Sequence, residues 1–275
     1  MKIRSQTVLA GLLWASASVV LAAPTSVNLT TWTAESYPAV SGFSAGLWTV
    51  QGGGSSVYQS VNGQPTLFVS DFNTFGSKIT GKISSSGGGD DDFIGFALGY
   101  QSGDTNNASA NYLLIDWKAG TQNFNFGTPS NSPGGTANAG LAVSRVSGIP
   151  DADEFWQHAN LAGTVAGSGL EELQRGSTLG NTGWAVNTTY EFTFDFGPND
   201  LVVFVDGVKQ LEIAGSFANG AMAFYNFSQA NVTYSAFTID EGSFPPPNSV
   251  PEPGSLALIS LGLAGLALRR KRAGY

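Results

Sequence analysis

Cysteine is absent from this chain of 275 residues, and histidine occurs once, at position 158. Without cysteine there are no disulfide bonds, so a bound metal is one of the few remaining ways to staple loops together. A Ser-His-Asp catalytic site would have to use His158, because no other histidine exists. The aromatic neighbours Phe155 and Trp156 favour a structural role for His158 instead.

Long apolar runs are absent from the interior of the chain and occur only at its ends. Residues 1–22 begin with Lys2 and Arg4, continue through an apolar stretch and end in the small residues Ala22 and Ala23. This order is typical of a secretory signal peptide. An uncleaved membrane anchor is the alternative, but the shortness of the run and the small residues favour cleavage and export.

The second apolar run lies in residues 250–275. Pro251, Glu252 and Pro253 precede thirteen apolar or small residues, 256–268, and the basic cluster 269–272 follows. Thirteen helical residues span ~20 Å, less than the ~30 Å hydrocarbon core of a bilayer. The pattern predicts a short transmembrane helix that anchors the chain transiently in the inner membrane, with the basic tail on the cytoplasmic side. An ordinary single-span tail anchor remains open.

Basic side chains are scarce, with 12 Lys and Arg against 20 Asp and Glu. Between the predicted signal peptide and the tail, six basic and 19 acidic residues give a net charge of about −13. Such a surface repels phosphate backbones and anionic lipids. We therefore exclude nucleic acid as a partner and expect divalent cations to be favoured.

Short alternating segments dominate the interior and are typical of antiparallel strands. In residues 190–196 four aromatic side chains share one face and three polar ones the other. Residues 201–205 and 208–213 are joined by Asp206-Gly207, which predicts a two-residue type I′ hairpin turn. Further strands are expected at 48–51, 66–70, 78–84, 93–100, 112–118, 141–146, 221–227 and 232–239. We expect an arm at 23–46 that leads to the first strand, a loop at 123–139, and a short helical turn within 151–174, indicated by the residues around Trp156 and by the run 170–173. Two packed antiparallel sheets follow, of immunoglobulin-like or jelly-roll type.

Three adjacent carboxylates, Asp90, Asp91 and Asp92, stand directly in front of the strand at 93–100. One face of that strand is bulky and the other nearly bare, with Gly95 and Gly99, which predicts a position in the middle of a sheet. Together with residues 112–118 it forms an acidic hairpin. Calcium is bound by such closely spaced oxygens on loops, but from these residues alone a solvated acidic turn is the favoured interpretation of the triplet. An EF-hand loop starting at Asp104 fails, because Ser109 stands where glycine is required.

Glycoside hydrolysis needs two carboxyl groups ~5–9.5 Å apart. Glu191 and Asp195 share one strand face but lie roughly 13 Å apart at ~3.3 Å per residue. The position between them is Thr193, so no close carboxylate pair is marked, and a pair from different strands stays open.

The acidic hairpin carries a resemblance to a known family. Residues 90–101 (Asp-Asp-Asp-Phe-Ile-Gly-Phe-Ala-Leu-Gly-Tyr-Gln), with 112–118 and Thr121-Gln122, resemble the C-terminal lectin-like domain of thrombospondins. The resemblance covers roughly residues 48–240 and implies a concanavalin-like jelly roll, an all-β antiparallel sandwich. It also favours calcium at Asp90, Asp91 and Asp92, with Asp104 and Asp116 as helpers.

The C-terminal end resembles the PEP-CTERM sorting signal of exported bacterial proteins, which implies processing by an exosortase-type enzyme near Pro251-Glu252-Pro253. The expected order is a signal peptide (1–22), an arm (23–46), a lectin-type sandwich (47–241), a proline-rich linker (242–249) and the sorting signal (250–275). We expect an exported, calcium-stabilised lectin-like module without enzymatic activity, binding extracellular polysaccharide at the bacterial surface. The alternatives are a structural matrix or biofilm component without a discrete ligand and, third, a glycoside hydrolase.

Overall fold

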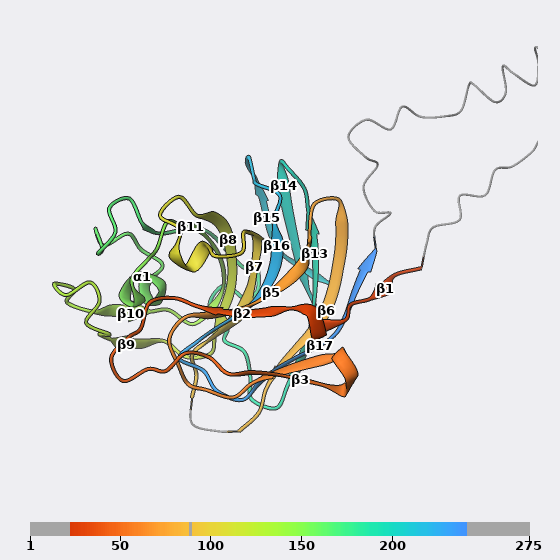
Figure 1. Ribbon diagram of the computed structural model, residues 1–275, viewed down its shortest axis with the longest axis horizontal. Helices are drawn as coiled ribbons and strands as arrows, with labels where there is room; N and C mark the ends of the chain where they lie inside the picture. The colour runs from red at the N-terminus through yellow and green to blue at the C-terminus, as the bar shows by residue number, and fades with distance from the viewer. Residues whose placement is uncertain (1–22, 88–89, 241–275) are drawn as a thin grey trace, which may run out of the picture.

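Two antiparallel sheets packed face to face make up the described part of the chain, residues 23–87 and 90–240 of a computed structural model (Figure 1). Sheet A has the strand order β15-β14-β13-β6-β17-β4-β3, with β1 beside β17, and sheet B has the order β12-β11-β8-β7-β16-β5-β2. The expected all-β jelly-roll sandwich is confirmed. The strands of sheet A are β1 (Thr25–Ser26), β3 (Trp48–Gln51), β4 (Ser56–Gln59), β6 (Ser77–Ser85), β13 (Thr189–Phe196), β14 (Asp200–Val205), β15 (Val208–Ala214) and β17 (Val232–Asp240). Those of sheet B are β2 (Thr33–Ser36), β5 (Thr66–Asn73), β7 (Phe93–Tyr100), β8 (Asn111–Lys118), β11 (Gly140–Ser147), β12 (Gly169–Arg175) and β16 (Ala221–Phe227).

Alternating polarity decides which face of each strand is buried. In β13 the phenylalanines point inward and Glu191, Thr193 and Asp195 point outward, as expected. The strand pairs with β6 on one side and with β14 on the other. Asp206 and Gly207 have φ values of 49° and 75°, so the turn between β14 and β15 has the positive φ angles of type I′.

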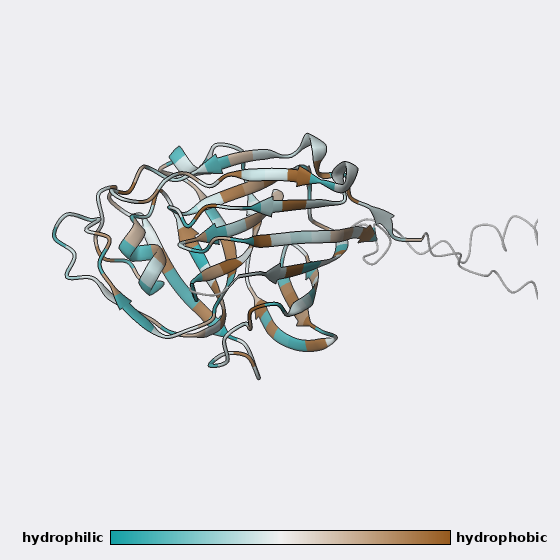
Figure 2. Ribbon diagram, turned by 90° about the horizontal axis from the view of Figure 1, so that it is seen from below, coloured by the Kyte–Doolittle hydropathy of each residue, from teal (hydrophilic) through white to brown (hydrophobic). Residues whose placement is uncertain are grey.

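Aromatic side chains fill the space between the two sheets. Phe96 of sheet B contacts Phe192, Phe194 and Tyr234 of sheet A, with ring centroids 4.9–5.7 Å apart. Trp117 and Trp184 also lie in this layer and are 1% and 4% exposed. Figure 2 shows hydrophobic and hydrophilic residues interspersed along the strands of both sheets. The burial of these large rings is the main stabilising term of the sandwich.

Sheet B is also covered on its outer face. A second cluster packs there, from β7, β8 and β16 below and from the helix α1 (Ala152–Gln157) above. All residues of β7 are buried, and the strand lies between β8 and β16, which confirms the predicted central position. Gly95 is required there, because a Cβ atom would lie 2.2 Å from the carbonyl oxygen of Ile115.

Three segments differ from the sequence-based expectation. The arm at 23–46 supplies β1 and β2, and Trp32, 6% exposed, packs into the core between the sheets. Residues 123–139, expected to be a loop, take part in the hairpin of β9 (Gln122–Phe124) and β10 (Gly135–Ala137). The helical turn expected around Trp156 is present as α1, but residues 170–173 are not helical, because they belong to β12, which pairs with β11.

The predicted signal peptide, the predicted linker and the sorting signal lie outside the described residues. Within 23–87 and 90–240 no helix is long and apolar enough to cross a membrane. Both ends of the described chain lie at the same end of the sandwich, since Thr25 pairs with Ile239. Figure 1 shows α1, β9 and β10 at the opposite end of the molecule.

Candidate metal centre at the start of strand β7

The three adjacent carboxylates come together where β7 begins. One oxygen from each of Asp90, Asp91 and Asp92 can be chosen so that all three lie within 4.8 Å of one another. Asp90 and Asp91 are half-buried, whereas Asp92 is 3% exposed. Two hydrogen bonds of its own main chain hold Asp92 in place. The Asp92 N–H donates to Gln229 Oε1 at 3.0 Å, and the Asp92 carbonyl accepts from the Trp184 indole at 3.0 Å. The arrangement offers converging oxygens to a hard cation.

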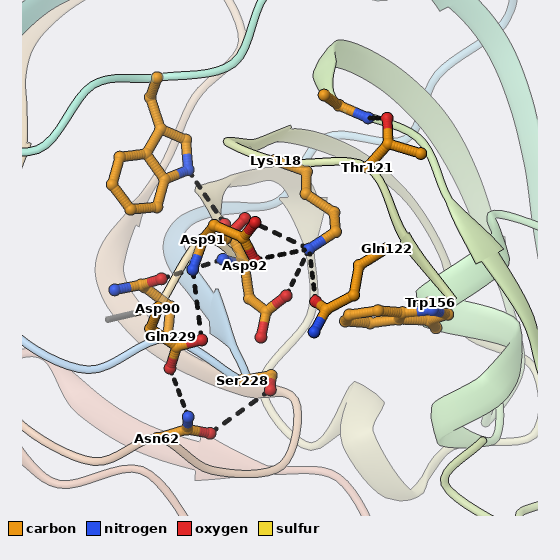
Figure 3. A network of polar contacts seen from close by, with 12 residues as sticks. Asn62, Asp90, Asp91, Asp92, Lys118, Thr121, Gln122, Trp156, Ser228 and Gln229 are labelled. Atoms are coloured by element: carbon orange, nitrogen blue, oxygen red, sulfur yellow. Dashed lines mark hydrogen bonds and ion pairs between the residues drawn. The ribbon is translucent and has the colours of Figure 1, made fainter. Parts of the chain in front are cut away.

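A lysine ammonium lies next to the triplet. Lys118, at the end of β8, pairs in register with Phe93 and is fully buried. Its Nζ donates to Asp92 Oδ1, to the Asp91 carbonyl at 3.2 Å and to Gln122 Oε1 at 3.3 Å (Figure 3). The same Nζ lies 3.6 Å from Asp91 Oδ1. One positive charge therefore contacts two of the three carboxyl groups, those of Asp91 and Asp92.

An aromatic ring completes the surroundings of the ammonium. Nζ of Lys118 lies 4.4 Å from the centroid of the Trp156 ring, which α1 supplies. A cation–π contact of this kind stabilises a cation that is removed from water. Lys118 was not predicted as a site residue. The sequence does contain a signal that identifies it: Lys118 lies on the same strand face as Tyr112 and Leu114. That face packs into the buried outer layer, where a charged side chain requires a partner.

The charge of the triplet is not fully balanced. Burial and the neighbouring carboxylates Asp92 and Asp91 raise the pKa of Asp90 to about 7. Asn62 Nδ2 donates to Asp90 Oδ2 and ties the triplet to the loop before β5. The first carboxyl group is thus costly to ionise without a further cation.

Asp104, predicted as a helper, does not join the triplet. It follows the other end of β7, and eight strand residues span roughly 26 Å. Its Oδ2 accepts from the Gln101 N–H at 2.9 Å and its Oδ1 from Asn107 Nδ2 at 2.9 Å. The side chain therefore serves to close its own turn.

Asp116, the second predicted helper, also has a different partner. It is fully buried in the middle of β8, opposite Gly95, and its Oδ2 lies 3.0 Å from His158 Nε2. His158 Nδ1 lies 3.0 Å from Glu172 Oε2. Burial lowers the pKa of His158, but the charges and hydrogen bonds of Asp116 and Glu172 outweigh it and raise that pKa to about 9. The imidazolium joins α1 to β8 and β12.

The candidate catalytic groups do not assemble into an active site. Both ring nitrogens of His158 are bonded to carboxylates, which leaves neither to act as a general base. Glu191 and Asp195 each pair with their own lysine on β6, Lys82 and Lys78, at 3.9 Å.

One Gly-x-Ser-x-Gly match occurs, at residues 42–46. A nucleophile elbow is a strand-to-helix turn. Ser44 instead forms an isolated bridge with Gly63, and no helix follows it.

Comparisons with known proteins match two regions of the chain. Residues 44–240 match the family model of the thrombospondin C-terminal region, and residues 249–272 match that of the PEP-CTERM protein-sorting motif. Thrombospondin-1 of Xenopus laevis is 26% identical over 199 residues, which cover 68% of this chain and 16% of that protein. Thrombospondin-2 of Homo sapiens is 25% identical over the same length and the same shares. The chain thus spans about 16% of the length of these curated relatives.

Solved structures with a similar fold show low sequence identity. The carbohydrate binding module CBM66 from Bacillus subtilis has a TM-score of 0.48 at 10% identity, covering 74% of this chain and 99% of that chain. The exoplasmic/lumenal domain of VIP36 in its Ca²⁺- and mannose-bound form has a TM-score of 0.45 at 10% identity, covering 78% and 85%.

Proposed function

Because the chain belongs to the family of the thrombospondin C-terminal region, we propose that it is a calcium-stabilised, lectin-like binding module. It is exported, carries a PEP-CTERM protein-sorting motif that an exosortase-type enzyme processes, is displayed on or released from the bacterial surface, and binds extracellular polysaccharide without catalysing a reaction. The calcium part of this proposal rests on the convergence of three carboxylates at the start of β7, where a single ammonium contacts only two of them.

The donor set fits calcium. Asp90, Asp91 and Asp92 would hold the ion, because carboxylate oxygens are the ligands that calcium prefers and the first two reach solvent. Lys118 neutralises one of the three charges, and the ion would neutralise the remaining two. When bound, calcium supplies charge compensation and fixes the loop that leads into β7.

The position of the chain ends supports surface display. Thr25 and Ile239 lie side by side, so the described chain begins and finishes at the same end of the sandwich. During transient anchoring by an inserted C-terminal helix, this end of the sandwich would face the membrane. The end of the molecule that carries α1, β9 and β10 then points away from the membrane (Figure 1).

The calcium proposal is tested by thermal unfolding of the purified protein in millimolar calcium and in chelator. At a hundredfold excess over Kd, a ligand that binds only the folded state stabilises it by about 2.7 kcal/mol. At roughly 2–4 °C per kcal/mol, the expected rise in Tm is about 5–11 °C.

Changing Asp90, Asp91 and Asp92 together to Ala should abolish this rise, whereas Glu212→Ala, at an exposed acid of β15, should preserve it. If the native protein shows no rise, it has no stabilising calcium site. If the rise survives the triple change, the ion binds elsewhere, and the acids of residues 195–206 are the next candidates.

A further inference from the structure

The β9–β10 hairpin differs in chemistry from the rest of the domain. Residues 119–144 contain no charged side chain, although the whole chain has a net charge of −8. Amides, hydroxyls, glycines and two phenylalanines make up most of the hairpin, and Gln122, Asn123 and Phe124 of β9 are all exposed. An uncharged polar surface on an acidic domain suits a neutral partner with many hydroxyl groups.

Buried aromatic residues hold the hairpin in place. Trp156 Nε1 donates to the Gly135 carbonyl at 3.1 Å, and its ring lies 5.3 Å from that of Phe126. Asp153 of α1 accepts from the Phe126 N–H at 2.8 Å. The hairpin therefore rests on a fixed base, and a surface that is ordered in advance loses less conformational entropy on binding.

Phe124 presents an aromatic ring at this surface. It is 39% exposed and is one of four large apolar residues in the described part of the chain with such exposure. The half-buried Phe43 packs edge-on against it, with ring centroids 6.1 Å apart. An exposed aromatic ring held by its neighbours offers an apolar face on which a ligand can stack.

Hydrogen-bonding groups lie beside this ring. Gln122 is two residues from Phe124 on the same strand face, and Lys118 orients it by donating to its Oε1 at 3.3 Å. The Nε2 of Gln122 makes no hydrogen bond to any other residue that the structure describes. On the other strand face, Asn123 donates to Thr136 at 3.2 Å, which leaves its Oδ1 available as an acceptor.

We propose that the β9–β10 hairpin, with the Phe124 ring as its stacking surface and the amides of Gln122 and Asn123 as hydrogen-bonding groups, binds neutral polysaccharide chains. A sugar ring would place its C–H face against Phe124 and its hydroxyl groups against the amide of Gln122, which lies on the same strand face. This inference rests on the proposed lectin-like function and specifies its surface and its ligand class. Lys118 links the hairpin to the carboxylate triplet through Gln122, so the two sites lie next to each other (Figure 3).

The test is affinity electrophoresis and titration calorimetry of the purified full chain, in calcium, with neutral glucans, mannans and galactans and with an anionic polyuronate. We expect binding to at least one neutral polysaccharide and weaker binding to the polyuronate. Phe124→Ala should weaken binding by about tenfold or more, as expected for an aromatic residue central to an interface. Phe124→Leu keeps apolar bulk against Trp156 and should weaken binding similarly, which separates loss of the ring from misfolding. Val208→Ala, at a residue that is 51% exposed beside the β14–β15 turn, should leave affinity unchanged.

The outcomes separate this inference from the function on which it rests. If the native protein binds neutral polysaccharide and both Phe124 variants bind equally well, the hairpin is not the site, although the lectin-like function stands. Tighter binding to the polyuronate than to every neutral chain would overturn the ligand class. If the native protein binds none of these polysaccharides, the lectin-like function itself fails, and this inference fails with it.

Discussion

Replacing Lys118 by Met tests how the charge of the triplet is balanced. The methionine side chain keeps most of the apolar stem but removes the ammonium from Asp92, from the Asp91 carbonyl and from Gln122. Asp92 is 3% exposed and would keep a negative charge without its partner. Asp90 and Asp91 would add to the repulsion. We expect the variant to be much less stable than the native protein in the absence of metal.

The magnitude follows from the burial of the pair. Removing one partner of a buried ion pair costs about 3–5 kcal/mol, because the other charge is left uncompensated. For a domain of this size the cost lowers Tm by roughly 6–20 °C. Lys82→Met is the matched control. Its side chain is 46% exposed and lies 3.9 Å from Glu191, so its removal should change stability by about 0–1 kcal/mol.

The assay is thermal unfolding in chelator and in calcium for the native protein, Lys118→Met, Lys82→Met and the pair Lys118→Met with Asp92→Asn. The double variant should recover much of the stability that Lys118→Met loses in chelator, because it no longer buries an unpaired charge. In Lys118→Met, calcium should raise Tm by more than in the native protein, since the ion then meets one more uncompensated carboxylate. Equal melting of Lys118→Met and Lys82→Met in chelator would refute the view that Lys118 balances the triplet.

Two further predictions concern other parts of the chain. The pKa of His158 is about 9 in the folded protein and ~6.5 when unfolded, so its ion pairs stabilise the fold fully below pH ~6.5 and are lost as pH rises through 9. Tm should therefore fall from pH 6.5 to 9 in the native protein, and by less in His158→Gln; parallel curves would contradict this. The tail from about Val250 should be absent from protein recovered from the host surface, which intact mass will show; a chain that still ends at Tyr275 would favour a simple anchor.

One kind of strand that could be predicted has two faces that differ strongly in burial. In β13 the aromatic face and the polar face alternate without a break, so the strand follows from the sequence, and the Asp206-Gly207 turn fixes the next hairpin. β7 could be predicted for a related reason, since Gly95 leaves room that only a close neighbouring backbone fills. In each case local chemistry and the final fold favour the same conformation.

The strands that were missed depend on contacts that the local sequence does not contain. In β12 the leucines Leu170 and Leu173 are three residues apart, which suits a helical turn, but pairing with β11 fixes the segment as a strand. The β9–β10 hairpin has no apolar alternation, and it is held by Trp156, about twenty residues further along the chain. Tertiary contacts thus override a weak local preference.

The candidate site was only half predictable for the same reason. Asp90, Asp91 and Asp92 are adjacent in the sequence, so their convergence required no knowledge of the fold. Their counter-ion is 26 residues from Asp92, and it becomes a neighbour only because β7 and β8 pair with Phe93 opposite Lys118. Asp104 follows the other end of β7, so the length of this strand separates it from the triplet, although the two are close in the sequence.

Two opposite charges on one face of β8 show how the sheet is joined to the layer above it. Asp116 and Lys118 are two residues apart on the same face, roughly 7 Å from each other. Each is fully buried and has a partner from a different segment: Asp116 bonds to His158 at the end of α1, and Lys118 to Asp92 before β7. Because a buried charge without a partner is costly, each pair favours only the arrangement that brings its segment against β8. The register of β8 therefore positions both α1 and the carboxylate triplet, and a shift of this strand by one residue would separate both pairs at once.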